Sequence, residues 1–139
     1  MFGMRFPTVA AVTGDIKTSL AMALFLAHDD ASLLETSKFE VADLRDGRNS
    51  LPSYLAALLR DKAPFPLMRS KLVLQSEAIV GSQLAGYWEL FETTAGEKGD
   101  VMKKALSVVN RSVISTARGD GFSTTRKSLF PESWKSVSV

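Results

Sequence analysis

A run of 27 residues without proline, from Leu67 to Thr93, constrains the fold of this chain more than any other feature. As one continuous helix it would be roughly 40 Å long, which is enough to span a domain. Its large apolar residues supply an inner face, and its small residues supply a ridge where a second helix can approach closely. The inner face comprises Leu72, Val73, Ile79, Val80, Leu84, Tyr87, Trp88 and Phe91, and the ridge Ala78, Gly81, Ser82, Ala85 and Gly86. We therefore expect a long central helix, and the alternative is a bend or break at Gly81 or Gly86.

Shorter helices are predicted around it. Apolar spacing indicates helices over Ile16 to His28 and Ala31 to Thr36. Pro52, at a favoured first helical position, indicates another from Ser50 to Asp61. A fourth is expected from Val101 to Arg118, preceded by Asp100 as its cap.

Evidence for strands is weaker. Arg5 to Val12 contains Pro7 before a run of apolar residues, and Phe39 and Val41 alternate with polar neighbours. The predicted fold class is therefore mainly α, a compact helical domain around one long central helix. The alternative is an α+β fold with a small N-terminal β element. We expect one helical domain over residues 1–118 and a basic tail over residues 119–139.

Composition is that of an ordinary globular protein. The 139 residues are 45% hydrophobic and 23% charged, and none is cysteine, so thiolate metal sites and cysteine nucleophiles are excluded. The longest apolar run, Leu20 to Ala27, is far shorter than the roughly 20 residues that cross a bilayer. We expect no membrane association and a cytoplasmic or intracellular location, within a nucleoprotein assembly in the first hypothesis below.

Positive charge is concentrated near the end of the chain. Residues 1–100 carry ten Lys and Arg against thirteen Asp and Glu, whereas residues 101–139 carry seven against two. Lys104, Arg111 and Arg118 recur every seven residues, with Lys103 beside the first, so they share one edge of a helix. Val101, Met102, Ala105, Leu106, Val108, Val109 and Val113 form the opposite, apolar arc. This edge is either a solvated face or a surface that binds anions.

The tail continues the basic pattern. Arg126 and Lys127 lie among aromatic residues that include Trp134, a combination that suits single-stranded nucleic acid. The alternative is that the aromatic residues dock the tail onto its own domain or onto a neighbouring subunit. Pro131 argues against a helix in this segment.

Catalytic patterns are incomplete. Residues 11–18 imitate a phosphate-binding loop, but Ala11 and Ile16 replace its two glycines, so we interpret the segment as a strand-to-helix turn. The single histidine, His28, has no second ligand for a metal site. The acidic pair of Asp43 and Asp46 is interpreted as a solvated face. We therefore expect no catalytic residues, no metal site and no cofactor.

The sequence favours function through a surface. The first hypothesis is a non-enzymatic nucleic-acid-associated structural or assembly protein that binds RNA or DNA without sequence specificity. The second is a protein-interaction or scaffold module that forms a homo-oligomer or binds an acidic partner, and a third is an enzyme that uses the loop of residues 11–18. The predicted phosphate-binding residues are Lys103, Lys104, Arg111, Arg118, Arg126, Lys127 and Trp134.

Overall fold

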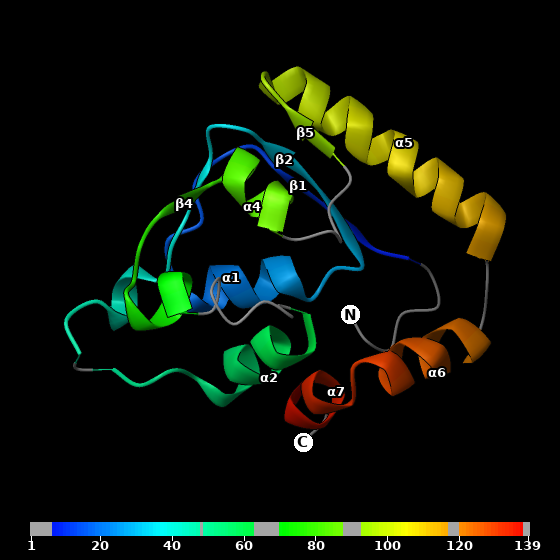
Figure 1. The fold of residues 1–139 in the computed structure, drawn as a ribbon. Helices are drawn as coiled ribbons and strands as arrows, with labels where there is room; N and C mark the ends of the chain where they lie inside the picture. Colours follow the sequence, from blue (N-terminus) through cyan, green and yellow to red (C-terminus); the bar gives the residue numbers. More distant parts are fainter. Residues whose placement is uncertain (1–6, 48, 63–69, 88–92, 117–119, 138–139) are drawn as a thin grey trace.

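A three-stranded parallel sheet is the centre of the computed structural model, which describes residues 7–47, 49–62, 70–87, 93–116 and 120–137 (Figure 1). The strands follow the order β1-β2-β5, so β2 lies in the middle. They are β1 (Val9–Val12), β2 (Asp30–Leu34) and β5 (Thr93–Ala95). The fold is mixed α/β, and the prediction of a mainly α domain is correct only in the abundance of helix.

Helices cover both faces of this sheet. Helix α5 (Lys98–Thr116) packs along one face, against all three strands (Figure 1). On the other side lies α1 (Ser19–Leu26), which packs in turn on α2 (Ser53–Lys62). The connection from β1 through α1 to the parallel strand β2 is therefore a β-α-β crossover.

The central strand shows why two layers of helices are needed. Ala31 and Leu33 point into the larger core, with Met22 and Phe25 of α1. Leu34 belongs to a second cluster on the α5 side. The hydroxyl of Ser32, between them, donates to the carbonyl of Val101 in α5 at 2.9 Å. Side chains therefore alternate between the two faces of the sheet, as in a strand that is buried on both faces. The helix predicted for Ala31 to Thr36 is wrong.

A second, two-stranded sheet pairs β3 (Lys38–Phe39) with β4 (Ile79–Val80) in antiparallel register. A 3₁₀ turn, η1 (Ala42–Leu44), follows β3. A short π-helical turn, η2 (Ser70–Leu74), precedes β4, and helix α4 (Gly81–Tyr87) follows it directly.

The predicted long central helix does not exist in this form, since its described residues are divided among η2, β4, α4 and β5. Ser76 adopts a positive φ of 50°, which no helix accommodates. Gly81 lies against the backbone of β2, because a Cβ added there would be 2.2 Å from the Leu34 carbonyl oxygen. The close approach expected at Gly81 is therefore made to a strand, and the chain bends there.

The remaining helices lie at the end of the chain. Helix α6 (Asp120–Leu129) is followed by α7 (Pro131–Val137), which packs against α2. Pro131 is the first residue of α7, where its missing N–H costs nothing, so the prediction that it excludes a helix is wrong. The helix predicted at Ser50 to Asp61 is confirmed as α2. The helix predicted at Val101 to Arg118 corresponds to α5, but α5 begins at Lys98, so Asp100 lies in its first turn and is not its cap, and Arg118 lies outside the described residues.

No helix in the described ranges is both long enough and apolar enough to cross a membrane.

Candidate functional site

The N-terminal end of α1 carries a buried serine that holds a carboxylate. Thr18 caps the helix, since its hydroxyl accepts from the backbone N–H of Ala21 at 3.2 Å. The backbone N–H of Ser19 donates to Oδ1 of Asp43 at 2.9 Å, and its hydroxyl donates to Oδ2 at 2.7 Å. Ser19 is only 2% exposed, whereas Asp43 is exposed. Two donors and the positive end of a helix therefore converge on an anion that solvent can reach.

Backbone hydrogen bonds place Asp43 there. The N–H of Ile16 donates to the Lys38 carbonyl at 2.8 Å, and the N–H of Ala42 donates to the Lys17 carbonyl at 2.8 Å. The segment before α1 is thus joined to β3 and η1. On the far side, the amide of Asn49 donates to the Asp43 carbonyl at 3.0 Å. Asp43 therefore stands on a supported turn.

An apolar cavity of about 310 Å³ lies between α2 and η2, and Thr18, Ser19 and Asp43 are not among its lining residues. Leu51, which lies two residues beyond Asn49, forms part of its wall. The guanidinium of Arg45 in the same loop donates to the Ser76 carbonyl, just after η2, at 3.5 Å. The wall consists of Leu51, Ala56, Leu59, Arg60, Ser70, Val73 and Leu74. We use the term α1–η1 site for Thr18, Ser19 and Asp43 together with this cavity.

The site has the parts needed to bind an acyl group that ends in a polar oxygen. An aliphatic chain fits an apolar cavity of this size, and a carbonyl or carboxylate oxygen fits the donors at the start of α1. Asp43 is an exposed carboxylate, which is a group of the kind that accepts protons in general acid–base catalysis. Among the described residues, no group of three or more His, Cys, Asp or Glu could hold a metal ion.

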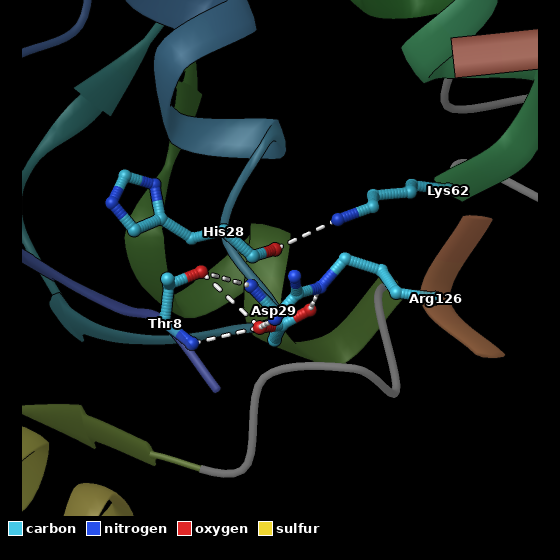
Figure 2. Close-up of polar contacts among 5 residues, drawn as sticks. All are labelled: Thr8, His28, Asp29, Lys62 and Arg126. Carbon is cyan, nitrogen blue, oxygen red and sulfur yellow. Dashed lines mark hydrogen bonds and ion pairs between the residues drawn. The ribbon is translucent and has the colours of Figure 1, made fainter. Parts of the chain in front are cut away.

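The C-terminal end of α1 holds a second aspartate in a different setting (Figure 2). The guanidinium of Arg126 in α6 donates two hydrogen bonds to the Asp29 carboxylate, from Nε to Oδ1 and from an Nη to Oδ2, each 2.7 Å long. The backbone N–H of Thr8 donates to the same carboxylate at 2.7 Å. The Arg126 side chain is 3% exposed and the Asp29 side chain 19% exposed, so this ion pair is largely shielded from solvent. It attaches the C-terminal helices to the start of β1.

Lys62, at the end of α2, completes this cluster. Its ammonium group donates to the His28 carbonyl at 2.8 Å (Figure 2). The same group lies 4.7 Å from the centre of the Phe130 ring. Burial disfavours the charged form, and nearby Arg126 adds repulsion, so the pKa of Lys62 falls from 10.5 to about 8. Asp29 and Asp61 oppose this shift. The cluster contributes to the packing of α1, α2 and α6.

The predicted phosphate-binding residues are distributed over different surroundings. Lys103, Lys104 and Arg111 are exposed on α5. Arg126 is buried against Asp29, because its helix packs with the guanidinium turned inward. Lys127 is half-buried, with its Nζ 4.1 Å from the centre of the Trp134 ring. Arg118 lies outside the described residues. The premise of one continuous open basic surface therefore fails at Arg126.

The apolar arc of the same helix is also only partly correct. Val101, Ala105 and Val108 are buried, but Met102 and Leu106 are exposed. The arc expected to reach the core is therefore narrower than predicted.

Sequence reasoning missed Ser19 and the role of Asp43. The interpretation of residues 11–18 as a strand-to-helix turn is confirmed, because they connect β1 to α1. Thr18 and Ser19 are typical N-terminal residues of a helix and could have indicated where α1 starts. Asp43 is 24 residues away from Ser19, and no local pattern reports such a contact.

The sequence matches no protein-family model and no curated protein at a significant level. The structure does match solved structures. An enoyl-CoA hydratase from Mycobacterium marinum matches with a TM-score of 0.81 at 12% identity, over 99% of this chain and 58% of that one. A probable enoyl-CoA hydratase from Mycobacterium tuberculosis matches with a TM-score of 0.82 at 10% identity, over 99% and 55%. A probable enoyl-CoA hydratase/isomerase from Mycobacterium abscessus matches with a TM-score of 0.75 at 18% identity, over 99% and 52%.

These matches correct the functional prediction. The hypothesis of a non-enzymatic nucleic-acid-associated assembly protein is wrong, because the chain shares part of the fold of structures described as enoyl-CoA hydratases and isomerases. The error arose because the charge pattern was interpreted without the packing that buries Arg126. The chain spans little more than half the length of the structures it matches. It therefore has part of the crotonase-like fold found in enoyl-CoA hydratases and isomerases.

Proposed function

We propose that this chain binds an acyl-CoA thioester at the α1–η1 site and moves a proton at the carbon next to the thioester carbonyl. The observation that carries the proposal is the convergence of the Ser19 N–H and hydroxyl on one carboxylate at the start of α1. The likeness to enoyl-CoA hydratases and isomerases supports the substrate class.

The two parts of the site divide the substrate between them. The acyl chain enters the cavity beside Leu51 and Leu59, where burying each methylene group contributes about 0.8 kcal/mol. The thioester oxygen takes the place of the Asp43 carboxylate at the N–H of Ser19. Asp43 is exposed and stands on η1, so its side chain has solvent to move into.

The same exchange places a base beside the substrate. When a proton leaves the carbon next to the carbonyl, the electron pair of that C–H bond moves into the enolate and negative charge develops on the thioester oxygen. The Ser19 N–H and the positive end of α1 stabilise this charge. Asp43 accepts the proton and returns it to the same carbon or to another carbon of the chain. No charge is left over at the end of the cycle.

The first experiment measures binding and proton exchange separately. Butyryl-CoA is titrated into the protein by calorimetry, and exchange of its α-protons in D₂O is followed by NMR. We expect binding by wild type and by Asp43→Asn, and a loss of exchange of about 100-fold or more in Asp43→Asn. Asp100→Asn is the matched control, since Asp100 lies in the first turn of α5 on the other face of the sheet. It should leave both quantities unchanged.

The second experiment tests the cavity. Ala56→Phe places a ring in it from α2, so octanoyl-CoA should lose more affinity than butyryl-CoA does. Equal losses would show that the acyl chain lies elsewhere. No binding of either thioester by the wild-type chain at millimolar concentration would overturn the proposed function.

A further inference from the structure

The cavity between α2 and η2 carries a positive charge at one end. Among the described residues that line it, Arg60 is the only one with a charged side chain. Along the α2 wall, Leu51 lies just before the helix and Arg60 lies near its end. The helix rises roughly 10 Å from Ser53 to Arg60. The lining of this wall is therefore apolar from Leu51 to Leu59 and cationic at Arg60.

Arg60 forms a loose, exposed ion pair. An Nη of its guanidinium lies 3.5 Å from Oε2 of Glu132 in α7, and both side chains are 56% exposed. Exposed pairs of this kind contribute little to stability, so another carboxylate can replace Glu132 without disrupting the fold. Arg126 is different, because its carboxylate partner Asp29 is held at 2.7 Å and its own side chain is buried.

The chemistry of arginine suits this position. Its aliphatic stem packs on apolar surface while the guanidinium stays in water. The guanidinium presents paired N–H donors that match the two oxygens of a carboxylate. Arg60 both lines the apolar cavity and remains exposed. An aliphatic chain in the cavity can therefore bury its methylene groups and still end beside a cation.

We propose that this cavity binds an aliphatic chain that ends in a carboxylate, and that Arg60 pairs with that carboxylate. Two sources have this chemistry. One is an acyl-CoA thioester with a carboxylate at the far end of its acyl chain, and this source rests on the proposed function. The other is a free fatty acid, which does not require it. In both cases Arg60 makes the difference, because a carboxylate placed against apolar side chains without a counter-ion binds poorly.

Calorimetric titration with octanedioyl-CoA and octanoyl-CoA tests the pairing, because the two thioesters differ only in the terminal carboxylate. The wild-type chain should bind octanedioyl-CoA about tenfold more tightly. Arg60→Met keeps an apolar stem and removes the charge, so it should reverse this preference. Arg111→Met is the matched control, since it removes an exposed cation from α5, on the other face of the sheet, and should leave the preference unchanged. Circular dichroism shows whether each variant is folded.

Glu132→Gln provides a change of the opposite sign. It removes the carboxylate that competes for Arg60, so the affinity for octanedioyl-CoA should rise about threefold while that for octanoyl-CoA stays unchanged. Equal changes for the two thioesters would count against a direct contact between Arg60 and the terminal carboxylate.

Free octanoate and 1-octanol separate this inference from the proposed function, because neither carries CoA. If no thioester binds but octanoate binds more tightly than 1-octanol in the wild type and not in Arg60→Met, the proposed function fails and the ligand is a free fatty acid. If both thioesters bind equally well and Arg60→Met changes neither affinity, the proposed function stands and the role of Arg60 is overturned. Absence of any Arg60-dependent preference for a carboxylate, in thioesters and free acids alike, would overturn the inference.

Discussion

An aspartate lies at each end of α1, and the two carboxylates differ in their exposure to solvent and in their hydrogen-bond partners. Asp43 at the N-terminal end is exposed, and its carboxylate accepts hydrogen bonds from Ser19. Asp29 at the C-terminal end is bound by Arg126 and Thr8, and its side chain is 19% exposed (Figure 2). The first carboxylate can be displaced by a ligand, and the second cannot be without unpairing a buried guanidinium. Accessibility therefore separates a candidate site from a structural contact.

The difference also explains why charge counting misled the functional prediction. Removing one partner of an exposed ion pair, or a solvated cation, lowers the free energy of unfolding only slightly. Removing one partner of a buried pair lowers it by several kcal/mol. Arg126 belongs to the buried class and Lys103 to the exposed one, although both are basic residues in helices. Three predictions test this contrast, from the largest expected effect to the smallest.

Asp29→Ala should have the largest effect on stability. Arg126 would lose its carboxylate partner inside the protein, so the free energy of unfolding should fall by about 3 to 5 kcal/mol. Urea denaturation measures this. Glu132→Gln is the control, because the Glu132 pair with Arg60 is exposed on both sides and 3.5 Å long. A double variant, Asp29→Leu with Arg126→Met, should recover part of the loss. Similar losses of unfolding free energy in Asp29→Ala and Glu132→Gln would contradict the expected difference between a buried and an exposed ion pair.

Lys62→Met should change how stability depends on pH. The pKa of Lys62 is about 8 in the folded chain and 10.5 in the reference state, so between these values the unfolded chain binds more protons. Stability of the wild type therefore rises with pH over this range. Lys62→Met should be stabilised most at pH 7, and its advantage over wild type should shrink by about 2 kcal/mol by pH 10.

Paired denaturation curves at pH 7 and pH 10 provide the measurement for Lys62→Met. The exposed Lys103→Met serves as the control and should show no such change. An advantage of Lys62→Met that stays constant with pH would mean that the ammonium group is solvated.

Asp43→Asn should have the smallest effect on stability. The amide oxygen still accepts from the Ser19 N–H, and the amide NH₂ group donates to the Ser19 hydroxyl in place of the hydrogen bond that Oδ2 accepted. The main loss is the charge at the helix end, which is worth about 0.3 to 1 kcal/mol. Thermal unfolding measures this loss. The expected pattern is a small change in stability together with a large loss of proton exchange. If Asp43→Asn lowered the free energy of unfolding as much as Asp29→Ala does, Asp43 would be a structural contact like Asp29.

Much of the local structure could be predicted from the sequence. β1, α1, α2 and α5 follow from apolar runs, from Pro52 and from the turn before Ser19, although their exact ends differ. The predicted helix from Ala31 to Thr36 failed because a central strand of a parallel sheet is apolar on both faces. Periodicity alone does not distinguish such a segment from a buried helix.

The candidate site could not be predicted in the same way. Thr18 and Ser19 lie inside the helix predicted from Ile16 to His28, and Asp43 was interpreted as part of a solvated face. The contact between Ser19 and Asp43 depends on the pairing of Ile16 with the backbone of β3. The long-helix prediction failed for a related reason, because the approach of Gly81 to Leu34 joins two segments far apart in sequence.

By itself the sequence determined the elements whose stability is local: the apolar runs, the turn into α1, the helix that follows Pro52, and most of the helix that contains Asp100. Tertiary structure alone decided which polar groups are buried and which are open. Arg126 and Lys103 have the same charge, and Asp29 and Asp43 the same carboxylate, yet packing encloses one of each pair and exposes the other. The physical reason is that desolvation depends on every segment packed around a group, and those segments are distant in the chain.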